Sequence, residues 1–325
     1  MREDKAKAIL CALLSAALFG ASIPLSKLLL GSLPPLLLAA LLYLGAGAGT
    51  FLLETLRGRL SRAPAETALT RKDVPCLAAV IALDAAAPIL ILLGLSRADP
   101  GAASLLSNFE IVATALLAAS LFKEAVGGRM WAAIGFITFA SVLLSCEDIG
   151  RFRFSAPALL ILAATVCWGM ENNLTRVLSE KNPFQIVVVK GLGSGGVALA
   201  IAFSAGAARG TLPAILLALL LGFCSYGMSI ALYIYAQRGL GAARTGTIYA
   251  IAPFVGYALS LAVFGWQGGG LAVPATAAMA VGAVLACLEK HTHPHRHGAL
   301  VHTHPHYAGL FHRHRHVRHT NENGG

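Results

Sequence analysis

Long apolar runs separated by short polar breaks recur along almost the whole chain. A stretch of roughly 20 apolar residues is long enough to cross the hydrocarbon core of a membrane as a helix. Ten such runs are expected to span, at Ala8–Leu30, Pro34–Leu56, Val74–Leu95, Gly101–Phe122, Met130–Leu144, Ala156–Leu178, Phe184–Ala205, Leu212–Ala236, Thr245–Phe264 and Leu271–Leu288. The chain is therefore expected to be an all-α integral membrane protein with the lipid bilayer as its partner.

Charge is scarce, and its placement indicates topology. Asp, Glu, Lys and Arg make up 12% of the 325 residues, about half of what a soluble domain carries. Before the last 35 residues, fourteen Lys and Arg lie on segments that share a side with the N-terminus, against five on the other side: Lys27, Arg97, Arg151, Arg153 and Arg209. Cytoplasmic loops hold such a surplus. We therefore attribute the net charge of +10 to the positive residues of cytoplasmic segments and expect no nucleic-acid partner. The expected location is the plasma (inner) membrane of a prokaryote, with both termini cytoplasmic.

No residue pattern typical of an enzyme occurs in the chain. The six cysteines are scattered without a close pair, which indicates neither a disulfide framework nor a zinc motif. Histidine, the commonest general base, is absent before His291. We expect no catalytic activity and no required cofactor.

The chain contains an internal duplication. Shifting it by 149 residues aligns Phe19-Gly20 with Trp168-Gly169, and shifting it by 142 residues aligns Ser104–Phe122 with Gly246–Phe264. Each half holds five of the apolar runs, and an odd number of spans forces the two halves into opposite orientations. Inverted repeats with a site near the bilayer midplane are typical of secondary transporters. The expected organisation is two five-helix repeats, 1–150 and 151–290, followed by a tail, 291–325.

Four motifs, in their order along the chain, carry a family resemblance. They are Phe19–Leu25, Ala103–Glu110, Phe122-Lys123-Glu124 and Glu171–Arg176. Over about residues 6–290 the sequence resembles the EamA family of the drug/metabolite transporter superfamily. The resemblance implies a carrier of ten helices, arranged as two inverted repeats of five, that moves small solutes, usually outward. The family often has proline after the position of Glu110, where this chain has Ile111, so we expect a straighter fourth span.

Two carboxyl groups lie near the middle of their spans. A charged side chain there costs about 2.5–3.5 kcal/mol on insertion scales, so it usually faces a cavity or a partner. At 1.5 Å per residue, Asp84 and Glu110 each lie about 15 Å from the start of their runs. The functional interpretation is a proton-coupling or cation-binding pair. The structural alternative is that each carboxyl group is protonated and hydrogen-bonded to a neighbouring helix.

Further polar side chains lie closer to the cytoplasmic side. Glu171 and Lys190 are each about 10 Å from that side on adjacent antiparallel spans, so their depths match and an ion pair is expected. Asn108 and Asn172 are amides that could line the same substrate or proton pathway, with bonding between helices as the alternative.

Two glycine-rich stretches, Gly45–Gly49 and Gly191–Gly196, interrupt the apolar runs. Small residues let helix backbones approach closely in a membrane. We expect both stretches to serve helix packing.

Every histidine of the chain lies in the tail: His291, His293, His295, His297, His302, His304, His306, His312, His314, His316 and His319. Neutral imidazole binds nickel, cobalt, zinc and copper well, and alternate spacing brings several imidazoles to one side of an extended chain. Pro294 and Pro305 disfavour a helix, so we expect a disordered, metal-binding tail. A polybasic tail that gains charge near pH 6.5 is the alternative.

Three functions remain open from the sequence. The first is export of a small metabolite or drug-like solute, with a cytoplasmic tail that binds nickel, cobalt or zinc. The second is efflux of those divalent metal ions with help from the tail. The third is a membrane-anchored metal sensor that no longer transports. The partner is then a small molecule or a metal ion, and pairing of two copies as a homodimer is left open.

Overall fold

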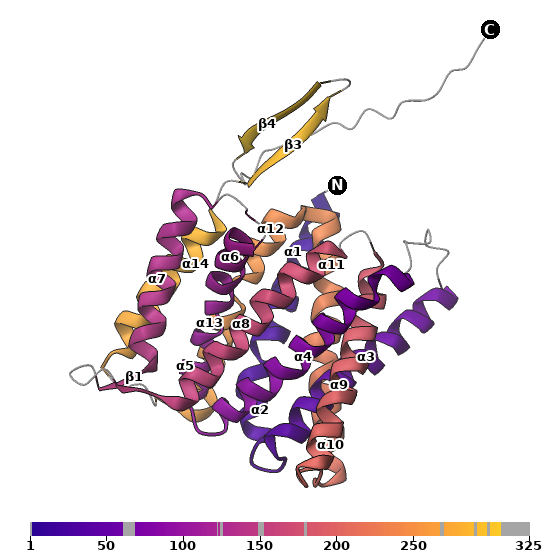
Figure 1. Cartoon of the computed structure of the whole chain (residues 1–325), viewed down its shortest axis with the longest axis vertical. Coiled ribbons are helices and arrows are strands. Elements are labelled where there is room, and N and C mark those ends of the chain that lie inside the picture. The colour runs from indigo at the N-terminus through magenta and orange to yellow at the C-terminus, as the bar shows by residue number, and fades with distance from the viewer. Residues whose placement is uncertain are drawn as a thin grey trace.

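The computed structural model of the chain describes residues 2–60, 69–121, 123, 126–148, 153–178, 181–266, 270–288, 291–297 and 300–306. These residues form a bundle of helices with two short hairpins (Figure 1). One hairpin pairs β1 (Cys146–Asp148) with β2 (Arg153–Phe154) between the two halves of the chain. Phe122 and Glu124 of the third motif lie outside the described residues.

The helices of the first half cover the five expected runs, some in two pieces. They are α1 (Arg2–Gly20), α2 (Ser22–Leu29), α3 (Pro35–Leu60), the short 3₁₀ helix η1 (Arg71–Asp73), α4 (Val74–Leu95), α5 (Pro100–Leu106), α6 (Phe109–Leu121) and α7 (Gly128–Ser145). Those of the second half are α8 (Ala156–Val177), α9 (Pro183–Ser204), α10 (Leu212–Gly222), the π-helical segment η2 (Phe223–Met228), α11 (Ser229–Leu240), α12 (Ala242–Tyr249), α13 (Ala252–Phe264) and α14 (Ala272–Cys287).

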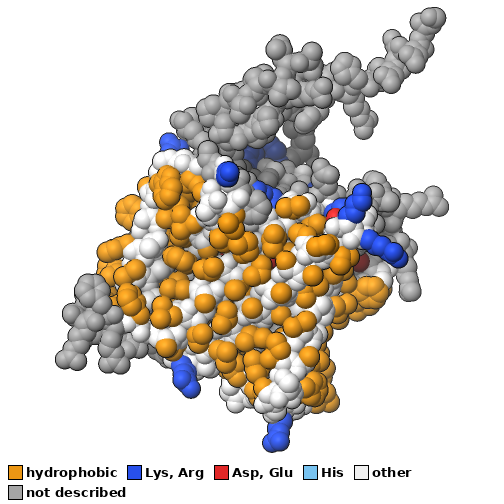
Figure 2. Space-filling model, viewed as in Figure 1, with side chains coloured by type: hydrophobic (Ala, Val, Ile, Leu, Met, Phe, Trp, Pro, Cys, Tyr) orange, Lys and Arg blue, Asp and Glu red, His pale blue; other side chains and the backbone are white. Residues whose placement is uncertain are grey.

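Eight helical segments in the described part of the chain are long and apolar enough to cross a membrane. Helix α14 is apolar but shorter, and α8, although it has 22 residues, is not among the eight. The polar residues Glu171, Asn172, Asn173 and Arg176 near the end of α8 explain this difference. Figure 2 shows hydrophobic side chains over the middle of one face and Lys or Arg at its two ends. The chain is a multi-pass helical membrane protein.

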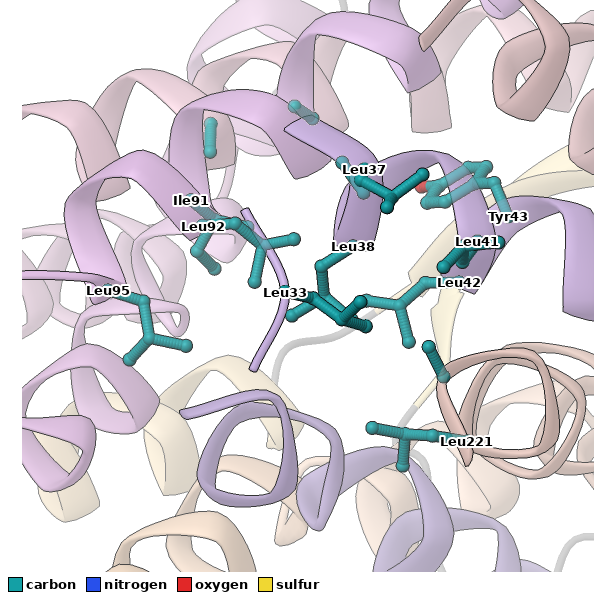
Figure 3. Close-up of a cluster of buried hydrophobic side chains, with 14 of the residues drawn as sticks. Leu33, Leu37, Leu38, Leu41, Leu42, Tyr43, Ile91, Leu92, Leu95 and Leu221 are labelled. Carbon is teal, nitrogen blue, oxygen red and sulfur yellow. The ribbon is translucent and has the colours of Figure 1, made fainter. Parts of the chain in front are cut away.

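A leucine-rich cluster joins the helices that lie near one end of the bundle. Leu38 and Leu42 of α3 pack with Leu92 of α4 and Leu221 of α10 (Figure 3). In lipid, helices associate by van der Waals packing because the acyl chains are as apolar as leucine. Close interlocking of these side chains therefore stabilises the bundle more than removal from water does.

Helices α3 and α9 cross with their backbones in close contact at two glycines. A Cβ atom added at Gly191 would lie 2.6 Å from the Cα of Gly47, and one added at Gly47 would lie 2.6 Å from the backbone nitrogen of Leu192. Real Cβ contacts are not this short. The expected packing role of the two glycine stretches thus has a structural basis at this crossing.

The fourth and ninth runs are each broken in the middle. Helix α5 ends at Leu106 and α6 begins at Phe109, so the expected straight fourth span is wrong. The side chain of Asn108 donates to the carbonyl of Leu105 at 3.2 Å, and Ser107 Oγ donates to the carbonyl of Ser104 at 2.6 Å. Such side chains compete with the helical backbone bonds. The break therefore does not need a proline at position 111.

The halves share this interrupted design. Shifting the start of α5 by 142 residues leads to Ala242, where α12 starts, and α12 and α13 are separated by the turn at Ala250 and Ile251. Each helix of one half packs on a helix of the other half. Helix α4 packs on α8 and, in the reciprocal arrangement, α1 packs on α11. Helix α3 packs on α9, and α7 packs on α14. Equivalent runs of the two halves thus have equivalent neighbours.

The first part of the tail has paired backbone where the sequence predicts disorder. Strand β3 (His291–His297) pairs antiparallel with β4 (Leu300–His306), with Pro294 opposite Thr303 and Pro305 opposite Thr292. Both strands of a two-stranded sheet are edge strands, where proline is tolerated because its missing N–H can face outward. The hairpin and the start of α1 lie at the same end of the bundle (Figure 1).

Candidate functional site

A pocket lies where the interrupted helices of both halves meet. It is lined by Phe19, Gly20, Ser22, Ile23, Ser104, Ser107, Glu110, Trp168, Tyr226 and Pro253. The α1–α2 break, the α5–α6 break, η2 and the start of α13 all contribute to this wall. Broken helices and π-helical turns are frequent at functional sites because they release backbone groups from regular pairing.

Glu110 is the charged residue among those that line the pocket. It lies in the first turn of α6, directly after the break, and its Oε1 accepts a hydrogen bond of 2.6 Å from Nδ2 of Asn172 in α8. Asn172 is exposed although its helix is part of the bundle. The neighbouring Asn173 is buried and donates to the carbonyls of Gly169 and Thr114. The two amides hold α8 against α6.

A second polar cluster surrounds Lys190 of α9. Its Nζ lies 2.5 Å from Oε1 of Glu171 in α8 and 3.1 Å from Oδ2 of Asp84 in α4. The Asp84 and Glu171 side chains are 2% and 6% exposed and that of Lys190 is 18% exposed, so the two acids are buried and the lysine is partly so. The hydroxyl group of Thr175 also donates to Glu171 Oε1. Lys190 thus connects three helices.

Two aromatic side chains link the Lys190 cluster to the pocket. The Tyr43 hydroxyl donates to Oδ1 of Asp84 at 3.3 Å, and Nε1 of Trp168 donates to the Tyr43 oxygen at 3.2 Å. Trp168 lines the pocket, whereas Tyr43 is buried. Two consecutive hydrogen bonds therefore connect Trp168 on the pocket wall with Asp84.

Aromatic rings form a continuous series beside the pocket. Phe19 contacts Tyr226 edge-on at 5.7 Å between centroids and Tyr249 at 5.5 Å, while Tyr249 contacts Tyr233 at 5.1 Å. On the other side, Tyr226 lies 5.7 Å from the Tyr43 ring. Rings from both halves of the chain therefore share one wall.

The structure brings together some of the residues singled out in the sequence and separates others. Glu171 and Lys190 are in direct contact, as their matched depths suggest. Asp84 joins them, while Glu110 accepts a hydrogen bond from Asn172, so the two midplane carboxyl groups have different partners. Asn108 is buried and bonds within its own turn.

Sequence reasoning missed most of the pocket wall. Phe19, Ser22, Ser104 and Ser107 lie within segments that indicate the internal duplication or the family resemblance but do not by themselves indicate a pocket. Trp168 aligns with Phe19 under the 149-residue shift, and this pairing of rings across the repeat is the signal that could have found both residues.

The tail histidines are described in part. The backbones of His291, His293, His295 and His297 lie in β3 and those of His302, His304 and His306 in β4, whereas His312, His314, His316 and His319 lie outside the described residues. In the described part of the chain, no group of three or more His, Cys, Asp or Glu side chains is placed to hold a metal ion.

Comparison with known proteins places the chain in a family. The model of the EamA-like transporter family matches twice, at residues 6–146 and 155–288. An uncharacterized transporter of Methanothermobacter thermautotrophicus is 28% identical over 250 residues, which cover 72% of each chain. A crystal structure of a protein that is 22% identical matches with a TM-score of 0.59 over 86% of this chain and 95% of its own, which bears on the fold alone.

Fold and site together define a multi-pass helical membrane protein with a pocket between its two halves. Because the family model covers nearly all of residues 6–288, the chain belongs to the EamA-like transporter family.

Proposed function

We propose that this protein is a secondary transporter that exports a small solute, and that the solute binds in the pocket between the two halves. The observation that carries the proposal is the position of Glu110: a carboxyl group on the pocket wall, beside the α5–α6 break and bonded across to α8. Sites at the contact of two repeats suit alternating access, since one half can rock against the other around a fixed solute.

The proposed framework is ten spans in two inverted halves of five. Support comes from the two matches of the family model, from the corresponding breaks of α5–α6 and α12–α13, and from the exchanged packing partners of α4, α8, α1 and α11. Helices α8 and α14 would be the sixth and tenth spans. The proposed orientation places both termini in the cytoplasm of a prokaryote, following the distribution of Lys and Arg.

Within this framework the two midplane carboxyl groups have different roles. We assign Glu110 to the pathway of solute or proton because it lines the pocket, with Asn172 orienting its carboxyl group. Asp84 and Glu171 hold Lys190 and fix the contact of α4, α8 and α9. Tyr43 and Trp168 transmit changes in the pocket to this cluster.

Everted membrane vesicles test the transport function without a known substrate. Vesicles that contain the full chain are energised and mixed with amino acids, amines, nucleosides and organic acids, and their contents are measured by mass spectrometry. We expect at least one solute to accumulate, to be lost with Glu110→Gln and to be kept with Glu54→Gln. Glu54 lies in α3 and is a matched acidic control outside the pocket wall. Accumulation of no solute would contradict transport.

For the tail we propose cytoplasmic binding of nickel, cobalt or zinc. The hairpin register sets His291, His293 and His295 opposite His306, His304 and His302. Opposed positions in an antiparallel pair lie on the same face, so the backbone register pairs histidine positions of the two strands. Neutral imidazole is a good ligand for these ions. The tail would buffer or sense metal while the pocket carries the solute.

Metal as the exported cargo is tested separately. Cells that express the full chain or a variant ending at Lys290 are grown with nickel, cobalt or zinc, and their metal content is measured. Unchanged metal content in both would leave the organic solute as the cargo. A fall in content that needs Glu110 would instead favour metal efflux.

A further inference from the structure

We propose that the pocket selects a small organic cation, namely an ammonium group carried on an aromatic or aliphatic body. The inference rests on the proposed transport function and names the substrate class of the same pocket. Three features of the wall support it: its charge, its hydroxyl groups and its rings.

The charged residue on the wall is an acid. Glu110 contributes a carboxyl group, and the other lining residues are uncharged. The half-buried Lys190 lies with its Nζ 3.1 Å from a carboxylate oxygen of Asp84 and 2.5 Å from one of Glu171. Its charge is therefore already compensated by two acids. A solute carboxylate would find no equivalent partner on this wall, whereas an ammonium group would find Glu110.

Two of the three serine hydroxyl groups on the wall, those of Ser104 and Ser107, are arranged as acceptors. Ser104 Oγ donates its proton to the carbonyl of Pro100 at 2.8 Å, and Ser107 Oγ donates to the carbonyl of Ser104 at 2.6 Å. A hydroxyl group has one proton to donate and two lone pairs. With the proton committed to the helix, each oxygen can accept a bond from the solute. An ammonium group supplies donors for such acceptors, while a carboxylate does not.

The rings complete the preference for a cation. Phe19, Trp168 and Tyr226 line the pocket. Because Phe19 contacts Tyr226 edge-on, the faces of these two rings point in different directions. The face of an aromatic ring attracts a cation through its quadrupole, and tryptophan does so most strongly. The same rings would hold an apolar solute body, so they suit an amine better than an inorganic ion.

The test compares three probes that share a phenyl body and differ in charge. Phenethylammonium is a cation, phenylalanine a zwitterion and 3-phenylpropanoate an anion. Binding to the purified full chain is measured by calorimetry at pH 7. We expect phenethylammonium to bind at least tenfold more tightly than either of the others. Equal binding of the three probes, or no binding of phenethylammonium at millimolar concentration, would overturn the inference, and this comparison needs no variant.

Variants then locate the selectivity. Glu110→Gln is expected to weaken binding of phenethylammonium at least tenfold, and Trp168→Leu about threefold or more, while Glu54→Gln leaves it unchanged. Unaltered affinity in Glu110→Gln would place the cation elsewhere and overturn the assignment. In the vesicle assay, accumulation of a neutral or anionic solute would overturn the substrate class but keep the transport function, whereas accumulation of no solute would contradict transport itself.

Discussion

The Nζ of Lys190 lies 3.1 Å from Oδ2 of Asp84, although these residues belong to helices of different halves of the chain. Glu171 shares the same ammonium group at 2.5 Å. Two carboxylates so close to each other would repel strongly in a medium of low dielectric constant. The lysine therefore stabilises the contact of α4 and α8 at the point where the two carboxylates meet.

Replacing Lys190 by methionine is expected to destabilise the protein. The substitution keeps most of the volume but leaves two buried carboxyl groups without their cation, and removal of one partner of a buried ion pair costs about 3–5 kcal/mol. The midpoint of thermal unfolding in detergent should fall clearly. Adding Asp84→Asn to Lys190→Met removes one of the two charges and should recover part of the loss. If the double variant is less stable than Lys190→Met, the cluster does not act through charge.

The crossing of α3 and α9 predicts that Gly47→Ala and Gly191→Ala destabilise the bundle. Each added Cβ atom would meet backbone atoms at 2.6 Å, and overpacking of this kind costs about 1–3 kcal/mol. Gly196→Ala is the matched control on the same helix, since a Cβ atom there meets nothing within 4 Å. When denaturation is measured in mixed micelles, Gly196→Ala should be as stable as the wild type. Equal losses in all three variants would indicate that helix crossing is not the cause.

Sequence reasoning found the features that depend on a single run or on its depth. Apolar length located the eight helical segments of the described part that are long and apolar enough to cross a membrane, and equal depth on adjacent spans indicated the contact of Glu171 with Lys190. It could not join Asp84 to them, because the contact depends on how α4 is rotated against α8 and α9. The pocket rings were equally hidden, since an aromatic residue within a span serves packing as readily as binding. The absence of proline at position 111 predicts a straight fourth span, but the Ser107 and Asn108 side chains compete with the helical backbone bonds and the span is broken there.

Lys27 joins α2 to the end of α4, and we expect this contact to stabilise the protein. Its Nζ donates to the carbonyls of Leu95 and Ala98 at 2.7 and 2.9 Å, at the end of α4. A cation suits the negative end of a helix, and loss of a charged hydrogen bond costs about 1.5–3 kcal/mol. Lys27→Met should therefore lower the thermal stability of the purified protein. The exposed Arg97 on the same connection is the control, and Arg97→Gln should have little effect; equal losses would argue against fastening by Lys27.

We expect the histidine-rich tail to bind metal ions independently of transport. Calorimetric titration with Ni²⁺ should show saturable binding to the full chain and none to a variant ending at Lys290. Because imidazole must be neutral to bind a metal ion, the affinity should fall as the pH drops through about 6.5, the ordinary pKa of histidine.

Paired variants test whether the hairpin register matters for this binding. His293 and His304 lie opposite each other, as do Thr292 and Pro305. Replacing His293 and His304 by asparagine should lower the number of Ni²⁺ ions bound, whereas Thr292→Ala should not. If replacing His312 and His314 lowers the number equally, the ions bind to any histidines of the tail and the register has no role. Uptake of the exported solute into vesicles should remain unchanged in each variant, because the tail lies outside the pocket wall.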